Sequence, residues 1–207
     1  MVELTKEAAR EIKPGTTRTR IVDAATMLFW RQGYHPVSTD AICRAAGINK
    51  GSLYFVFPAK ADILLACLQA VAETEWAEIE AIYAEPGLDL ETRFRTHMEW
   101  FAESQRSLKA RSGAVLGTFD MAMGVSIPEA VMETMRTYRE RHLARLNQVV
   151  AELLGAGQSD GAAWLTDLIG QLVSGASIRA RLGDDLAPLE ELPATVFRLI
   201  ALLRAAG

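Results

Sequence analysis

Residues 37–60, VSTDAICRAAGINKGSLYFVFPAK, carry the pattern that decides the fold of this 207-residue chain. The pattern predicts a short helix over residues 38–46, a turn at Gly47 and a second short helix over residues 49–57. Two short helices joined by a tight turn that contains glycine form the helix-turn-helix unit, whose second helix enters the major groove of DNA. The stretch therefore predicts a DNA-reading unit.

Helical patterns also precede and follow this stretch. Apolar residues recur at the spacing of an amphipathic helix at Ile21, Ala24, Ala25, Leu28 and Phe29, and together they form one face. Similar periodicity continues to the end of the chain, and no alternating strand pattern appears. The sequence predicts an all-α fold of about nine helices. We expect a helix-turn-helix domain at residues 14–60 and a helical domain at residues 61–207.

The composition excludes several classes of protein. A hydrophobic content of 50% excludes a disordered chain, and no apolar run is long enough to span a bilayer. The N-terminal residues mix acids and bases without the apolar core of a secretory signal. Two separated cysteines, Cys43 and Cys67, and three histidines give neither a disulfide framework nor a metal-binding spacing. We expect a cytoplasmic protein with no cofactor, no metal and no membrane contact.

Charge is distributed unevenly along the chain. The net charge is -4, yet residues 1–60 hold more basic than acidic residues and the remainder is acidic. A basic N-terminal third fits a small DNA-binding head on a body that avoids DNA. Chance asymmetry of an ordinary solvated surface gives the same distribution, so charge alone does not decide.

The residue types in the decisive stretch suit contact with DNA. Ser38 and Thr39 can cap the first helix, and their hydroxyls suit a nearby phosphate oxygen. Lys50, at the start of the second helix, is the best-placed residue to reach a base edge. Leu53 and Phe57 are expected to anchor this helix inward.

The run RTRIVDAATMLFWRQGYHPVSTDAICRAAGINKGSLYFVFPAKADIL, residues 18–64, resembles the N-terminal domain of TetR-family transcriptional regulators. The matching positions are Arg18, Ala24-Ala25, Leu28-Phe29, Gly33-Tyr34, Ser38-Thr39, Ile42, Ala46-Gly47, Leu53-Tyr54, Phe57, Lys60 and Leu64. Their joint spacing over this length is specific. The resemblance implies phosphate contacts from Ser38, Thr39, Tyr54 and Lys60, and an approach to bases by Lys50, Gly51, Ser52 and Phe55.

Alternatives remain for some of these residues, and two positions depart from the family pattern. Tyr54 can also be a half-buried packing residue. Arg18 and Arg20 can reach phosphates or merely solvate the first helix. Val56 stands where the family usually has His or another polar residue, which removes one phosphate contact. Cys43 replaces a small Ala, which a buried thiol can mimic sterically.

The resemblance implies that the body binds an effector and forms a dimer. The last two predicted helices are candidates for the dimer interface, because they carry long apolar stripes and the small residues Gly175 and Ala176. Large adaptable side chains gather between residues 90 and 142, as in pockets for apolar ligands. The predicted ligand-binding residues are His97, Met98, Trp100, Phe101, Phe119, Met123, Tyr138 and His142. Each of them can instead be an ordinary core residue.

The leading hypothesis is a dimeric repressor that binds palindromic operator DNA and is released by a small, largely apolar ligand. By resemblance, the long helix that begins at Lys60 couples the two functions. The alternative is a ligand-binding or scaffold protein with a weakened DNA head, for which Val56 is the support. No catalytic triad, phosphate loop or nucleotide-binding motif is apparent, so an enzyme is not expected.

Overall fold

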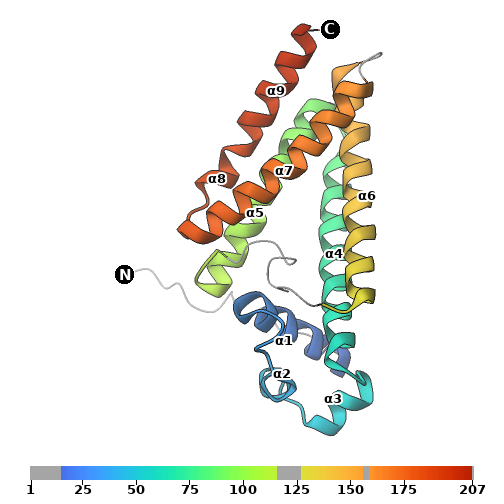
Figure 1. Cartoon of the computed structure of the whole chain (residues 1–207), viewed down its shortest axis with the longest axis vertical. Helices are drawn as coiled ribbons and strands as arrows, with labels where there is room; N and C mark the ends of the chain where they lie inside the picture. Colours follow the sequence, from blue (N-terminus) through green and yellow to red (C-terminus); the bar gives the residue numbers. More distant parts are fainter. Residues whose placement is uncertain (1–14, 116–126, 156–158, 207) are drawn as a thin grey trace.

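A computed structural model describes residues 15–115, 127–155 and 159–206, and these residues form helices joined by short connections (Figure 1). The helices are α1 (Thr17–Gln32), α2 (Thr39–Ala46), α3 (Lys50–Val56), α4 (Lys60–Ala84), α5 (Leu90–Ser112), α6 (Glu129–Leu154), α7 (Ser159–Gly183), α8 (Ala187–Glu190) and α9 (Leu192–Ala206). The predicted all-α class is confirmed. We call α1 to α3 the head and the helices after α4 the body.

The head lies at one end of the molecule, and side-chain caps define its helices (Figure 1). The Ser38 hydroxyl accepts a hydrogen bond from the backbone N–H of Ala41 over 3.1 Å, which begins α2. Gly47 ends α2 with a φ of 63°, a left-handed conformation that favours glycine. The Asn49 side chain caps α3 by accepting from Ser52 N over 2.7 Å. The predicted turn chemistry is therefore present.

The core of the head continues into the first turns of α4. Ile21 and Phe29 of α1 are fully buried in one cluster with Ile63, Leu64 and Cys67 of α4. Cys43 is buried in the same cluster, as expected for a thiol that replaces a small apolar residue. Because α4 then runs on into the body, the head and the body share a rigid element.

The body helices α5, α6, α7 and α9 surround a second core together with the later turns of α4 (Figure 1). Phe94, Met98, Leu165 and Ile169 are among its fully buried side chains. The short helix α8, which no periodic pattern in the sequence predicted, turns the chain from α7 into α9. Within the described residues no single helix is long and apolar enough to cross a bilayer, although α3 and α4, bent by 66° at their junction, together reach the length and composition required.

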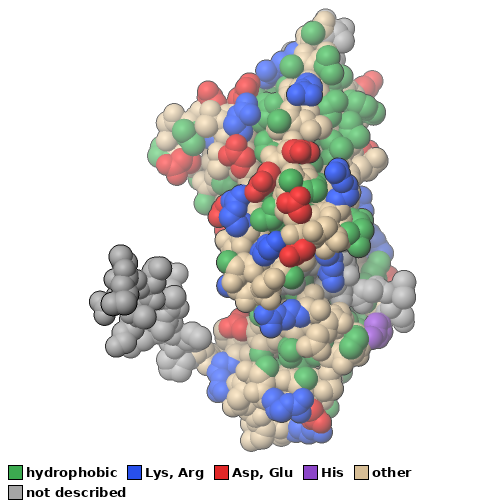
Figure 2. Space-filling model, turned by 90° about the vertical axis from the view of Figure 1, so that its left-hand side faces the viewer, with side chains coloured by type: hydrophobic (Ala, Val, Ile, Leu, Met, Phe, Trp, Pro, Cys, Tyr) green, Lys and Arg blue, Asp and Glu red, His purple; other side chains and the backbone are tan. Residues whose placement is uncertain are grey.

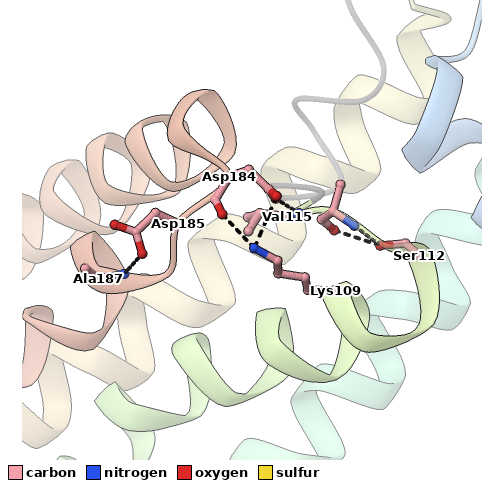
Figure 3. Close-up of polar contacts among 7 residues, drawn as sticks. Lys109, Ser112, Val115, Asp184, Asp185 and Ala187 are labelled. Carbon is pink, nitrogen blue, oxygen red and sulfur yellow. Dashed lines mark hydrogen bonds and ion pairs between the residues drawn. The ribbon is translucent and has the colours of Figure 1, made fainter.

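The turn after α7 is tied to the end of α5 (Figure 3). Asp184, with a φ of 48°, accepts hydrogen bonds from Val115 N over 2.8 Å and, through its carbonyl, from Lys109 Nζ over 2.6 Å. The Val115 N–H bond and the Lys109 ammonium, which lies 3.3 Å from Oδ2, hold the pKa of the Asp184 carboxyl below its usual value. Gly113 ends α5 in a left-handed conformation. The apolar sequence of residues 113–124 is typical of a buried helix, and that helix stays a prediction because residues 116–126 lie outside the described part.

Candidate nucleic-acid interface

Helix α3 turns an anchoring face towards α1 and α2 and an exposed face outward. Leu53 is fully buried and Phe57, which caps the helix, is 2% exposed, so both fix α3 against the head. Tyr54 and Phe55 are 47% and 91% exposed. Exposure of an aromatic ring to water is unfavourable unless a partner covers the ring. Phe55 is the most exposed of the large hydrophobic side chains described. The outward face of α3 is therefore shaped for contact with another molecule.

The start of α2 lies beside this exposed face. The Thr39 hydroxyl is 3.2 Å from the Tyr54 hydroxyl, within hydrogen-bond distance. The Ser38 hydroxyl uses a lone pair to cap α2 and keeps its hydrogen for an external acceptor. Three hydroxyls from two helices thus gather at one edge of α3, where they can donate to phosphate oxygens.

Lys50 has an ionic partner that the sequence analysis did not assign. Its Nζ lies 2.8 Å from Oδ1 of Asp40, in the first turn of α2. This hydrogen bond raises the pKa of the Lys50 ammonium. Gly51 and Ser52 follow in the same exposed first turn of α3.

The two arginines of α1 make contacts within the head. Arg20 Nη2 donates to the carbonyl oxygens of Ala46 and Gly47 over 2.5 and 2.8 Å. These carbonyls end α2 and need donors, so Arg20 stabilises the turn between α2 and α3. The Arg18 guanidinium lies 4.6 Å from the centre of the Phe57 ring. The sequence foresaw neither of these internal contacts, and contact of Arg18 and Arg20 with phosphate stays a prediction.

An open polar hollow of about 600 Å³ lies on the Arg20 side of the turn. Arg44, Asn49 and Ser52 line it together with Thr17. Arg44 is exposed and was not singled out from the sequence, because an isolated surface arginine has no distinguishing pattern. The hollow offers donors next to the first turn of α3, and none of the described residues that line it is acidic.

Lys60 is held inside the head. Its Nζ donates to the carbonyl oxygens of Tyr34, Val37 and His35 over 3.0, 3.0 and 3.4 Å. The ammonium also lies 4.2 Å from the centre of the Tyr34 ring. Burial lowers the pKa of Lys60. In this structure the Lys60 ammonium fastens the loop between α1 and α2 to the start of α4, and its contact with phosphate stays a prediction.

The predicted ligand-binding residues fall into two groups in the body. His97, Met98 and Phe101 of α5 lie together, with the His97 and Phe101 rings stacked at 6.1 Å. Tyr138 and His142 of α6 have ring centres 4.2 Å apart. Trp100 meets the Phe101 ring edge-on at 5.0 Å, and its Nε1 donates to Glu78 over 2.8 Å. It also lines a surface groove of about 560 Å³ near Arg106 and Pro193. Phe119 and Met123 lie outside the described residues.

Two buried imidazoles lie between α4, α5 and α6. The Tyr83 hydroxyl is 2.9 Å from Nδ1 of His97, whereas Nε2 of His97 and Nε2 of His142 are buried without a hydrogen-bond partner among the described residues. Burial lowers the pKa of His97 to about 3 and that of His142 to about 4, so both imidazoles are neutral. The Trp76 ring meets the His142 ring edge-on at 5.3 Å. The cluster combines aromatic surface with unsatisfied polar atoms.

An apolar stripe on α7 is left open. Trp164, Ile178 and Leu182 are 55%, 48% and 83% exposed, and their spacing places them on one face of the helix. Gly175 lies on this face, and no atom of the described residues comes within 4 Å of a Cβ added there, whereas Ala176 is buried inside the body. Figure 2 shows hydrophobic side chains gathered towards the upper end of the molecule, whereas Lys and Arg side chains are spread along its length.

The head therefore has the caps, turn and outward second helix of a helix-turn-helix domain, which places the chain in the helix-turn-helix class of regulators. Residues 21–67 match the sequence model of the family described as bacterial regulatory proteins, tetR family. Residues 21–67 thus belong by sequence to this family of transcriptional regulators, and the resemblance seen in residues 18–64 is confirmed.

Known relatives are similar mainly over the head. The probable HTH-type transcriptional regulator ArpR of Pseudomonas putida is 34% identical over 89 residues, which cover 43% of this chain and 40% of ArpR. The HTH-type transcriptional regulator TtgR, also of Pseudomonas putida, is 35% identical over 74 residues, which cover 36% of this chain and 33% of TtgR. The chain thus spans two fifths or less of the length of these relatives.

Solved structures extend the similarity of fold to the body. The regulatory protein TetR from Rhodobacter sphaeroides has a TM-score of 0.76 at 23% identity, over 89% of this chain and 99% of that one. A TetR transcriptional regulator from Legionella pneumophila has a TM-score of 0.77 at 21% identity, over 90% and 98% of the two chains.

Proposed function

We propose that the protein binds palindromic operator DNA as a homodimer, represses transcription there, and is released by a small, largely apolar ligand. The observation that carries the proposal is the outward face of α3, where Tyr54 and Phe55 are exposed beside Lys50 while Leu53 anchors the helix. A recognition helix reads base edges from its first turn, and residues beside it position the duplex through phosphates.

The proposed DNA contacts come from the head. The phosphates of one DNA strand contact the hydroxyls of Ser38, Thr39 and Tyr54. Lys50, Gly51, Ser52 and Phe55 approach the bases, and Arg18 and Lys60 supply positive charge at the margins. We place the border between the two domains near Lys60. The Lys60 ammonium at the start of α4 binds the loop between α1 and α2.

Dimerisation through α7 and α9 is supported by apolar residues that the body leaves exposed. Trp164 and Leu182 on α7 and Leu202 on α9 are all more than half exposed. Gly175 allows a neighbouring helix to approach closely. A two-fold dimer presents two recognition helices to successive major grooves, which explains why a palindromic site is expected.

The ligand site is proposed in the buried cluster around His97 and His142, with Met98, Phe101 and Tyr138. Neutral imidazoles with unpartnered Nε2 atoms can each make one hydrogen bond to a ligand whose remaining surface is apolar. Ligand binding must favour the state that does not bind DNA, because equal affinity for both states shifts nothing.

The test is binding of labelled duplexes that contain the promoter region next to the protein's own gene. We expect tight, salt-dependent binding with a two-fold symmetric footprint, and a Lys50→Ala variant that loses sequence preference. Apolar ligands that release the duplex should lose their effect in a His97→Phe, His142→Phe variant. A folded, dimeric protein that binds no duplex at low salt would refute the proposed function.

A further inference from the structure

An ion pair joins the two helices of the helix-turn-helix at the point where bases are read. Asp40 Oδ1 is 2.8 Å from Lys50 Nζ, and the two side chains are 49% and 61% exposed. Asp40 is the only acidic residue in the sequence between Asp23 and Asp62. A lone carboxylate thus lies against the lysine at the first position of the recognition helix.

Neither the stability of the fold nor the strength of DNA binding explains why a carboxylate lies at this position. A solvent-exposed Lys–Asp pair contributes little to stability. Phosphates repel a carboxylate, and a lysine paired with it releases fewer counterions on binding, so the pair weakens sequence-independent attraction to DNA. Asp40 also suits the positive end of α2, but that interaction requires no partner on α3.

We propose that Asp40 is a specificity-determining residue, which holds Lys50 over one base pair and reads, together with Lys50, a guanine paired with cytosine. The inference rests on the proposed function, because it requires α3 to enter the major groove. Asp40 also keeps Lys50 from swinging to a phosphate, so sequence-independent binding is weakened while the chosen base pair is favoured.

The hydrogen-bonding groups match this base pair. The Lys50 ammonium has three donors, of which one serves Asp40 and two remain for O6 and N7 of guanine. The second oxygen of Asp40 can accept from the N4 amino group of cytosine, which lies next to O6 in the groove. Adenine replaces O6 with an amino group, a donor that opposes the ammonium.

The experiment compares the full-length wild type with Asp40→Asn, Lys50→Ala and the double variant. Each protein is titrated with the best duplex selected from a random pool, with duplexes that carry single base-pair changes in both half-sites, and with a non-operator duplex at several salt concentrations. Asp40→Asn keeps the shape of the side chain and removes its charge. A second variant, Asp40→Ser, keeps a helix-capping oxygen in case the amide disturbs α2.

We expect Asp40→Asn to bind the non-operator duplex about fivefold more tightly near 0.15 M salt, with a steeper salt dependence, because one more counterion is released. At a single position, its preference for G·C should fall about tenfold or more. Lys50→Ala should lose preference at the same position, and the double variant should discriminate no worse than Lys50→Ala, since the two side chains act as a unit.

Asp23→Asn is the matched control, because it makes the same change of charge on exposed α1 without contact with Lys50. It should leave every base-pair preference unchanged. The inference is overturned if Asp40→Asn and Asp40→Ser keep the wild-type preferences, or if the position that depends on Lys50 prefers A·T. Absence of duplex binding by the folded wild type would instead overturn the proposed function, and the inference with it.

Discussion

Arg31, in the last turn of α1, donates a hydrogen bond from Nη2 to the carbonyl oxygen of Ser112, the last residue of α5, over 3.0 Å. The contact joins the head to the body at a place distant from the start of α4. Ser112 is followed closely by Val115, whose N–H is bound by Asp184 after α7 (Figure 3). The end of α5 therefore contacts both the head and the turn that leads to α8.

Replacing Arg31 with alanine should loosen this junction. The free energy of unfolding is expected to fall by about 1 kcal/mol, the net contribution of one exposed hydrogen bond to a charged donor. Urea denaturation measures the change, and amide hydrogen exchange should rise in the last turns of α1 and α5. Arg139→Ala, on an exposed position of α6, is the control and should change stability by less than about 0.5 kcal/mol.

Replacing Lys60 with alanine should destabilise the protein as well as affect DNA binding. The carbonyl oxygens of Tyr34 and Val37 lose their donor in this variant. A partly buried group left without a partner costs about 1–3 kcal/mol. Thermal unfolding should therefore separate Lys60→Ala from Lys50→Ala, whose ammonium lies in solvent. Equal stability of the two variants would show that the Lys60 contacts contribute nothing to folding.

Stability should decrease as the pH falls below neutrality. Burial lowers the folded-state pKa of His97 to about 3 and that of His142 to about 4, whereas an unfolded chain has a histidine pKa of about 6.5. Between these values the unfolded state binds protons that the folded state does not. The contribution of the two histidines to the free energy of unfolding is therefore fully present above the unfolded pKa and is lost as the pH falls towards the folded pKa. His97 alone should account for about 2 kcal/mol between pH 7 and pH 5.

Urea denaturation at pH 7, 6 and 5 checks this dependence. A variant with His97→Gln and His142→Gln should show a flatter profile, because neither amide titrates. His35→Gln, on an exposed loop position, serves as the control and should keep the wild-type slope. A double variant with the same slope as the wild type would contradict the assignment to these two imidazoles.

A charge on the open stripe of α7 should weaken the proposed dimer. Trp164→Glu places a carboxylate at a position that is 55% exposed in the single chain. If the stripe is buried on dimerisation, the unpaired charge should cost about 3 kcal/mol, roughly a hundredfold in the dimer dissociation constant. Sedimentation velocity over a range of concentrations measures this constant. Leu88→Glu, at a 39% exposed position between α4 and α5, should leave it unchanged.

Local chemistry explains why much of the head was predictable. Ser38, Gly47 and Asn49 act within three or four residues of their own positions, so their types and spacing reveal the caps and the turn. Leu53 and Phe57 follow helical periodicity and are buried as expected. The helical periodicity after residue 60 likewise predicted an all-α body, as observed in α5, α6, α7 and α9.

The remaining contacts join residues of different elements, and the sequence does not show which of these residues meet in the fold. Arg20 contacts the end of α2, and Lys60 contacts the loop between α1 and α2. In each case the partner lies 26 residues away along the chain. Asp40 and Lys50 meet only because the turn brings α2 and α3 together. Helix α8 has four residues, too few for a periodic pattern. Gly175 and Ala176 look equivalent in sequence, yet one faces outward and the other is buried.

The cluster that joins Ile21 and Phe29 to Ile63, Leu64 and Cys67 limits how this chain can be recombined with its relatives. A chimaera cut at Lys60 would separate the two halves of that cluster and pair each half with unfamiliar side chains. A junction after Val71, the last α4 residue that packs against the cluster, would transplant it with its α4 side complete. For exchanging operator preference between regulators of this fold, the transferable module is therefore longer than the helix-turn-helix itself.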